Sequence, residues 1–182
     1  NGPMARCPRD LAALLDTMAG PDPRQPHGMA QAPTLPRIDG HIGDLRIGWL
    51  GDWDGALPME DGVLDLCAAA LRQFGHLGCA VSQLNAQARW EVARGMALTA
   101  MEVHAASVIR TDWFKTAAEL FQTCDVLALP AAQMWPFDVT LDWPRDIAGG
   151  GMDTYHRWME VGVPASLIGL PAVCVPAGFG GP

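Results

Sequence analysis

Residues 169–179 of this 182-residue chain read Gly-Leu-Pro-Ala-Val-Cys-Val-Pro-Ala-Gly-Phe. The four apolar residues 172–175 lie between Pro171 and Pro176, and a short apolar run between turn residues is typical of a fully buried strand. Proline has no backbone N–H donor, so both prolines belong at the ends of such a strand. This stretch therefore predicts a buried β-strand over residues 172–175, with Cys174 as a small buried side chain.

Three other short apolar runs predict strands near residues 45–50, 79–82 and 126–129. Between the first two, apolar residues recur at the spacing of one helical face, and an acidic first turn precedes them. The face is Val63, Cys67, Ala70, Leu71, Phe74 and Leu77, and the first turn carries Pro58, Glu60 and Asp61. A strand, a helix and a strand with short joints form a βαβ unit with parallel strands. The sequence thus predicts an α/β fold.

Four further helices are expected outside this unit, and the last is a short one after Asp153 with Tyr155, Trp158 and Met159 on one side. One lies near the start, with Leu11, Leu14, Leu15 and Met18 on one face, and the Pro- and Gly-rich residues 21–43 after it read as a long surface loop. Residues 90–109, rich in Ala and Met, predict a second helix. A third carries Phe114, Ala117, Ala118 and Phe121 on one face. Residues 131–151 are expected to be irregular.

Composition limits the classes of function. The formal net charge is −8, from 20 acidic and 12 basic residues, and nucleic-acid binding requires basic patches instead. No stretch of 18 uncharged apolar residues occurs, so no membrane partner is expected. The five cysteines form no C-x-x-C motif, which favours buried free thiols and a cytoplasmic location. The start, Asn1-Gly2-Pro3, has neither a signal pattern nor an initiator Met, which suggests a fragment.

Four segments resemble blocks of the amidase signature family, in the same order along the chain. Residues 1–12 are similar to its GPMAR-x-x-x-DLA helix, and residues 19–23 to the AGPDP that ends that helix. Residues 124–130 are similar to its DVLLxP strand, and residues 169–179 to its GLPA and VPAGF block. The resemblance implies part of a mixed, largely parallel sheet with covering helices, with residues 1–182 as a single partial domain.

The resemblance also implies an amidase that works through a nucleophilic Ser, a second Ser and a neutral Lys. Such a device forms and hydrolyses an acyl-enzyme. The chain has one lysine and three serines, and no Gly-Ser-Ser-Gly. They are Lys115, Ser82, Ser107 and Ser166. In the family the device precedes the segment that begins this chain, so no catalytic residue is expected here, and the missing N-terminal portion is the expected partner.

The loop after the strand that ends at Pro130 lines the acyl pocket in the family. The resemblance therefore implies a substrate pocket for a small-molecule amide, built from residues of this loop and of a later aromatic segment. Its candidate residues are Gln133, Met134, Trp135, Tyr155 and Trp158. No cofactor and no metal is expected, and a homodimer is a further expected assembly. Between the strands near 79–82 and 126–129, the chain is shorter than its relatives.

Two other interpretations stay open. The chain is alternatively a non-catalytic relative, either a degenerate paralogue or a module that pairs with another chain. A small redox or nucleotide-binding α/β domain is a third class, but the sequence has no C-x-x-C, no G-x-G-x-x-G and no phosphate-binding loop motif. The sequence that precedes Asn1 distinguishes the first two, because only an enzyme requires a Lys and a Gly-Ser-Ser-Gly there.

Overall fold

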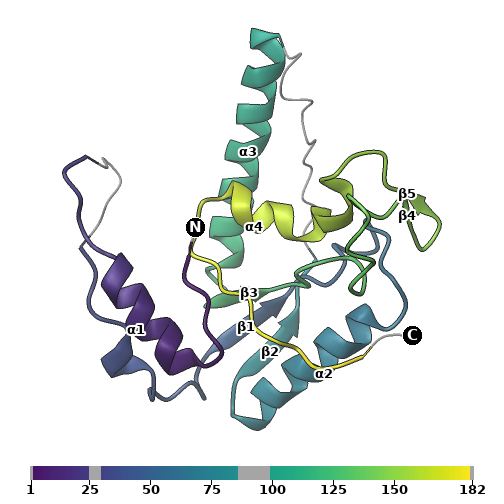
Figure 1. The fold of residues 1–182 in the computed structure, drawn as a ribbon. Coiled ribbons are helices and arrows are strands. Elements are labelled where there is room, and N and C mark those ends of the chain that lie inside the picture. The colour runs from purple at the N-terminus through teal and green to yellow at the C-terminus, as the bar shows by residue number, and fades with distance from the viewer. Residues whose placement is uncertain (1, 25–29, 86–98, 181–182) are drawn as a thin grey trace. The chain divides into compact units, whose positions relative to one another are not determined.

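The structure is a computed structural model that describes residues 2–24, 30–85 and 99–180 (Figure 1). The chain divides into two compact units, Asn1–Ile42 and Gly43–Pro182. The parallel sheet lies in the second unit. The assignment of residues 1–182 to one partial domain stays a prediction.

The first unit contains a helix and a short 3-10 turn. α1 spans Pro8–Met18, where a helix is expected, and η1 spans Leu35–Arg37 within the expected surface loop. The Asp16 carboxylate accepts hydrogen bonds from Leu35 N at 2.9 Å and from Thr34 N at 2.6 Å. These two bonds hold the pKa of Asp16 below its ordinary value, so the charged carboxylate ties η1 to α1.

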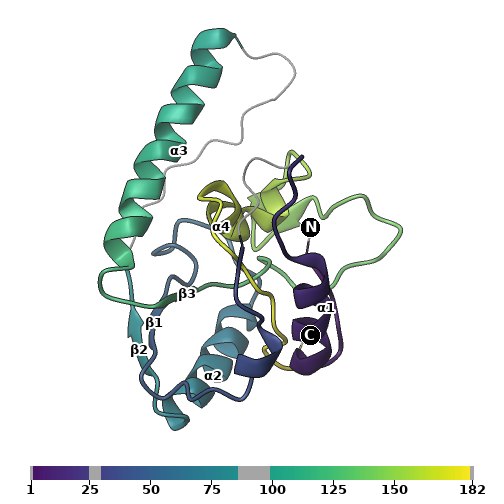
Figure 2. The same ribbon diagram turned by 90° about the vertical axis from the view of Figure 1, so that its left-hand side faces the viewer.

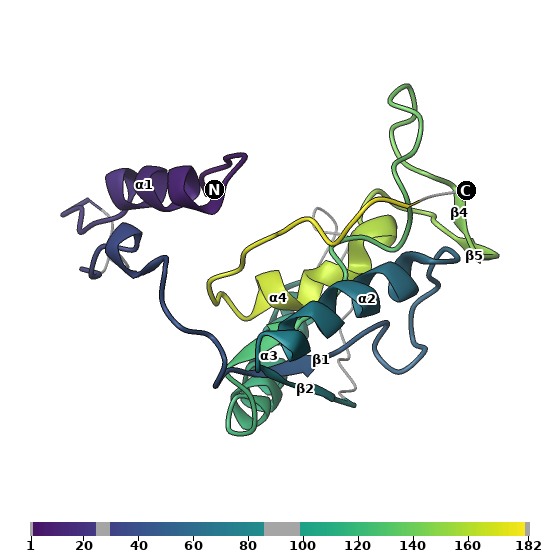
Figure 3. The ribbon, with the colours of Figure 1, turned by 90° about the horizontal axis from the view of Figure 1, so that it is seen from below.

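The second unit is built on a three-stranded parallel sheet. β1 spans Arg46–Trp49, β2 spans Ala80–Gln83 and β3 spans Val126–Ala128. Their order is β2-β1-β3, and β1 pairs with both neighbours in parallel. α2, Val63–His76, joins β1 to β2 and runs beside them (Figure 3). The predicted strands near 45–50, 79–82 and 126–129, the βαβ unit and the α/β class are confirmed.

The start of α2 differs from the prediction. Pro58, Glu60 and Asp61 are not in its first turn, because the helix begins at Val63 after Gly62. Gly62 has φ of 84°, in the left-handed region that favours glycine, so the chain turns sharply there. The two acidic residues consequently remain in the loop between β1 and α2.

An ion pair joins the starts of two neighbouring strands. The Asp125 carboxylate, just before β3, accepts hydrogen bonds from Arg46 Nη2 at 2.7 Å, Arg46 N at 2.9 Å and Arg46 Nε at 3.1 Å. The hydrogen bonds from the Arg46 side chain, followed by the bond from its backbone N–H, lower the pKa of Asp125 to about 2.

This pair predicts a loss of stability in acid. A carboxyl whose pKa is lower in the folded chain stabilises the fold above its unfolded pKa and loses that effect as it is protonated. The window for Asp125 therefore runs from pH 3.8 down to about 2. We expect Asp125→Asn to lower stability at neutral pH and to flatten its pH dependence in that window. Urea unfolding at several pH values tests this, with Asp112→Asn at another exposed carboxylate as the control. Equal pH profiles for the two variants would contradict it.

α3 is one continuous helix, Ala100–Leu120, and extends away from the sheet (Figures 1 and 2). The helical predictions over residues 100–109 and around Phe114 are confirmed, but the two segments form one helix instead of two, and residues 90–98 lie outside the described residues. Ala117 of the predicted face is buried, but Trp113 is buried in place of Phe114, which is 50% exposed, and Ala118 is exposed as well. None of the described helices is long and apolar enough to cross a membrane.

The core of the second unit brings together the chain after β1, α3 and residues 157–162, and its buried members are Leu50, Trp53, Trp113, Ala117 and Val161. η2 spans Arg157–Gly162 and α4 spans Val163–Leu167. The Trp53 and Trp113 rings meet edge to face, with centroids 5.4 Å apart. Their indole N–H groups donate to the carbonyls of Val161 at 3.1 Å and Pro164 at 2.9 Å. Both tryptophans are thus buried without an unpaired indole donor.

Residues 131–151, expected to be irregular, contain one small hairpin. β4, Asp146–Ile147, pairs antiparallel with β5, Gly150–Gly151. The turn between them is closed by a hydrogen bond from Gly149 N to Asp146 Oδ1 at 3.0 Å. This hairpin was not predicted, because strands of two residues leave no alternating pattern in the sequence.

The predicted buried strand over residues 172–175 is wrong. Residues 170–180 run as irregular chain after α4 (Figure 1). Val173 is 71% exposed and Val175 is 61% exposed, and Cys174 is exposed as well. Among the described residues, none forms a backbone–backbone hydrogen bond with this segment. An apolar sequence favours an extended backbone, but a strand exists only where a neighbouring strand pairs with it.

Candidate functional site

A pocket lies at the carboxyl-terminal edge of the sheet. Its volume is about 600 Å³, and we call it the Trp135 pocket. It is lined by Glu60, Asp61, Gly62, Leu66, Trp135, Ala148 and Gly180. β1 and β3 are parallel neighbours, so the loops that follow them leave the sheet from the same edge. One loop supplies Glu60 and Asp61, and the other supplies Trp135.

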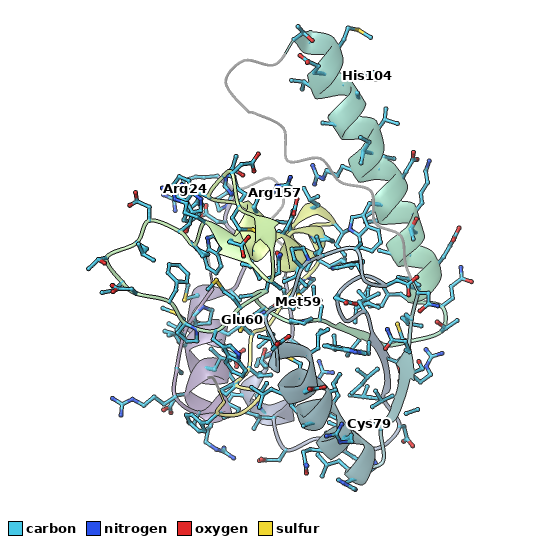
Figure 4. The ribbon with its side chains drawn as sticks, turned by 90° about the vertical axis from the view of Figure 1, so that its right-hand side faces the viewer. Arg24, Met59, Glu60, Cys79, His104 and Arg157 are labelled. Carbon is cyan, nitrogen blue, oxygen red and sulfur yellow. The ribbon has the colours of Figure 1, made fainter. Side chains whose placement is uncertain are left out.

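The backbone N–H and the indole N–H of Trp135 both donate hydrogen bonds to the loop before α2, and these bonds fix the two loops against each other. Trp135 N donates to Glu60 Oε2 at 2.8 Å, and Trp135 Nε1 donates to the Asp61 carbonyl at 3.0 Å. Glu60 lies beside Met59 near one end of α2 (Figure 4). The indole is therefore held in one orientation at the wall of the pocket, with its polar atoms bonded to protein and its rings facing Gly62 and Gly180.

The last described residues of the chain reach this indole. A Cβ built at Gly180 would lie 2.7 Å from Trp135 Cη2, and one at Gly178 would lie 2.9 Å from Leu66 Cδ1. Both positions therefore accept only a residue without a side chain unless the neighbours move. The C-terminal segment passes close to the pocket because it carries glycine where it meets Trp135 and Leu66.

The structure places Gln133 differently from the other candidates. Gln133 has no exposed surface. Its Nε2 donates to the Pro58 carbonyl at 3.1 Å, and its Oε1 accepts from Val161 N at 3.2 Å. Both ends of the side-chain amide are thus bonded to protein, and Gln133 is absent from the lining of the Trp135 pocket.

The remaining candidates form a separate aromatic group. Tyr155 contacts Trp158 edge to face at 6.2 Å and Trp143 at 6.4 Å, and Trp158 contacts Phe137 at 5.4 Å. The Trp158 Nε1 atom is buried and has no hydrogen-bond partner among the described residues. Met134 is partly buried. The structure thus brings Tyr155 and Trp158 together, but neither lines the Trp135 pocket. A substrate role for Met134, Trp135, Tyr155 and Trp158 stays a prediction.

The chain's own lysine and serines do not assemble into a reactive group. Lys115 Nζ bonds Asp112 at 3.2 Å on exposed α3, and Ser107 Oγ donates to the Val103 carbonyl at 3.0 Å. Ser82 and Ser166 are exposed and lie on β2 and α4. Burial raises the pKa of the Cys67 and Cys124 thiols, which disfavours the thiolate. Among residues 2–24, 30–85 and 99–180, no group of three or more His, Cys, Asp or Glu side chains could hold a metal ion.

Sequence reasoning missed most of the pocket lining. It assigned Glu60 and Asp61 to a helix start and gave no role to Leu66 or Gly180. Glu60 and Asp61 reach the pocket because β1 pairs with β3, and loops that follow neighbouring parallel strands meet at one edge of the sheet. Only Trp135 was found, through its place after β3.

Comparisons with known proteins agree with this architecture. No family model matches the chain. The chain is 26% identical to an acylamidase from Rhodococcus erythropolis, over 98% of this chain and 45% of that protein. It is 34% identical to one subunit of the glutamyl-tRNA(Gln) amidotransferase of Thermus thermophilus, over 46% of this chain and 18% of that protein. The chain thus spans less than half the length of these relatives.

A solved structure gives the same fold. It is that of a bacterial aryl acylamidase described as belonging to the amidase signature enzymes, and it superposes with a TM-score of 0.87 over 98% of this chain and 46% of that one, at 19% identity. Similarity in sequence and in fold therefore both run along almost the whole chain. These similarities support the resemblance to the amidase signature family that the sequence motifs indicate. The Trp135 pocket is consequently a feature of an amidase signature fold, at the carboxyl-terminal edge of its parallel strands.

Proposed function

We propose that this chain is part of an amidase-type hydrolase that cleaves the C–N bond of a carboxylic amide. The observation that carries the proposal is the similarity to an acylamidase over 98% of the chain. A 1-carboxybiuret hydrolase from Pseudomonas, one subunit of which is 39% identical over 38% of this chain, supports the same class. Because the chain spans less than half of the acylamidase, the activity is proposed for a protein that contains further residues.

The proposed chemistry is the Ser-Ser-Lys acyl-enzyme mechanism. A serine oxygen bonds to the amide carbonyl carbon, while its proton passes through a second serine to a neutral lysine. The proton then moves to the nitrogen as the C–N bond breaks, and the amine leaves. Water cleaves the acyl ester, releases the carboxylic acid and restores the serine. We place this triad upstream of the chain, since Lys115 and the three serines here are bonded elsewhere or lie apart.

The contribution of this chain is then a wall of the substrate cleft. The Trp135 pocket offers an indole surface, the Leu66 side chain and two acidic residues around about 600 Å³. A pocket of this size with an aromatic wall fits the acyl part of a small-molecule amide. The proposal includes no cofactor, a cytoplasmic location, and pairing of this chain with the N-terminal portion of the same domain. A homodimer is a further proposed assembly.

The coding sequence that precedes Asn1 tests the proposal directly. An in-frame continuation that encodes a lysine and Gly-Ser-Ser-Gly is the expected result. The complete product should then hydrolyse an aryl amide, and replacement of the Gly-Ser-Ser-Gly serines by alanine should abolish the activity. A stop codon followed by unrelated sequence would oppose the proposal, and so would a complete product that contains the triad but hydrolyses no aryl or linear amide.

Trp135→Ala should change the acyl preference of the complete enzyme. The indole wall contributes to binding only for acyl groups large enough to touch it, and such contacts are worth about 1–3 kcal/mol. The ratio of kcat/KM for an aryl acyl group to that for an acetyl group should fall by about tenfold or more. The control is Phe114→Ala, which removes an exposed aromatic side chain from α3. An unchanged ratio in Trp135→Ala would remove Trp135 from the substrate pocket.

A second candidate is a non-catalytic relative that pairs with another chain. The alignment with the acylamidase is 218 positions long, which exceeds the 182 residues of this chain, so the acylamidase has segments that this chain lacks. Loss of segments that an active relative retains favours loss of activity. A purified chain that remains folded and monomeric would favour this candidate, because a partial sheet with exposed edges should aggregate.

A further inference from the structure

The buried side-chain amide of Gln133 connects the loop before α2, which forms part of the Trp135 pocket, to η2. Gln133 bonds Pro58 through Nε2 and Val161 through Oε1, at 3.1 and 3.2 Å. Its backbone carbonyl accepts from Glu60 N at 2.8 Å, and its backbone N–H donates to the Trp158 carbonyl at 3.4 Å. Gln133 thus holds the loop before α2 on one side and η2 on the other.

The partners require a neutral amide at this place. The Pro58 carbonyl can only accept a hydrogen bond, and Val161 N–H can only donate one. A planar group that donates at one end and accepts at the other satisfies both, and a glutamine side chain is such a group. An apolar side chain would leave both backbone groups buried without a partner. A carboxylate would place a charged acceptor against the Pro58 carbonyl.

The same loop carries the pocket wall two residues later. Trp135 bonds Glu60 Oε2 and the Asp61 carbonyl, and Glu60 N bonds the Gln133 carbonyl. We propose that Gln133 is a positioning residue of the Trp135 pocket: its buried amide aligns the loop before α2 with the loop after β3, and so fixes the Trp135 indole against Asp61. This role rests on the proposed function only in so far as the pocket receives substrate.

Gln133→Glu provides a reversible test. Burial raises the pKa of a carboxyl group above its ordinary value. Below that raised pKa, the side chain is an uncharged acid that donates through its O–H and accepts through its C=O, as glutamine does. Above it, the donor is lost. The neighbouring segments carry further ionisable side chains, which are Glu60 and Asp61 before α2 and His156, Arg157 and Glu160 at η2, and Glu160 pairs with Arg157 at 3.5 Å. They are present in every variant, so they do not distinguish Gln133→Glu from its control.

The measurement is hydrogen exchange of the Trp135 indole N–H in the full 182-residue chain by NMR, from about pH 5 to about pH 9. The resonance is identified by its absence in Trp135→Phe. Gln73→Glu, at an exposed position on α2, is the matched control for added charge. The Trp143 indole N–H, which donates to the Met152 carbonyl at 3.0 Å, is the internal reference for general loosening.

In Gln133→Glu we expect Trp135 exchange equal to that of Gln73→Glu at low pH, and faster by about tenfold or more above the raised pKa. Trp143 exchange should be unchanged. Gln133→Leu should show the faster Trp135 exchange at every pH. Equal exchange in Gln133→Glu and Gln73→Glu at all pH values would overturn the assignment. So would an equal acceleration at Trp143, or a Gln133→Glu chain that is unfolded even at low pH. The assay involves no hydrolysis, so its result is independent of whether the enzyme cleaves amides.

Discussion

Trp113→Ala is expected to lower the free energy of unfolding by about 3–5 kcal/mol, because it removes a large side chain from a packed core. Trp113 is 5% exposed and meets Trp53 edge to face. Its loss also leaves the Pro164 carbonyl without the indole donor that lies 2.9 Å away. Domains of this size are stable by about 5–15 kcal/mol, so this one substitution should remove a large part of the stability.

Urea unfolding followed by circular dichroism measures this loss, and the neighbouring Phe114→Ala is the matched control. Phe114 lies on the same helix and is 50% exposed. We expect Phe114→Ala to change the stability by less than about 1 kcal/mol. The apolar spacing predicted Phe114 on the buried face, so the comparison also tests the register of α3. Similar losses of unfolding free energy in the two variants would show that Trp113 is not the core residue of this part of α3.

Gly48→Ala should destabilise the chain by about 1–3 kcal/mol, because the centre of the sheet has no room for a methyl group. Gly48 is buried in β1, between β2 and β3. A Cβ there would collide with the Leu84 side chain and lie 3.2 Å from Cys124 Sγ. Leu84 can move at some cost. Cys124 is 1% exposed, so a shift of its side chain would disturb the surrounding core.

The control for Gly48→Ala should change stability in the opposite direction. Gly75 lies in α2, and no heavy atom is within 4 Å of a Cβ built there. Alanine is favoured over glycine in a helix by about 1 kcal/mol, so Gly75→Ala should be neutral or stabilising. Thermal unfolding of the two variants gives the sign of each change. A Gly48→Ala chain as stable as Gly75→Ala would contradict the packing described for β1.

The sequence was sufficient for the strands whose partners lie within the chain. The short apolar runs near residues 45–50, 79–82 and 126–129 formed a parallel sheet, since each has a neighbour at the right register. The run over 172–175 has the same composition but forms no backbone pairing with any described residue. Composition specifies that a segment can be a strand, whereas the neighbour that pairs with it is a property of the whole fold. For that reason the most conspicuous apolar run gave the wrong prediction.

The site was predictable only in part for a related reason. Trp135 was predicted because the family resemblance implies that the loop after this strand lines the acyl pocket. Its bonding partners Glu60 and Asp61 lie about 75 residues earlier and are brought to it by the pairing of β1 with β3. Gln133 was predicted to line the pocket because the family resemblance implies that the loop after Pro130 lines the acyl pocket. Its buried amide instead serves two backbone groups from distant segments, and no local pattern indicates such contacts.

The irregular segment after α4 has a consequence for the handling of this chain. Its exposed N–H and C=O groups can template the addition of a strand from a neighbouring molecule. Pro171 and Pro176 donate no backbone hydrogen bond, so the fully competent stretch is restricted to residues 172–175, about 13 Å of chain. Any intruding strand would therefore be held by only a few bonds. Self-association through this segment should accordingly be weak, concentration-dependent and reversible on dilution.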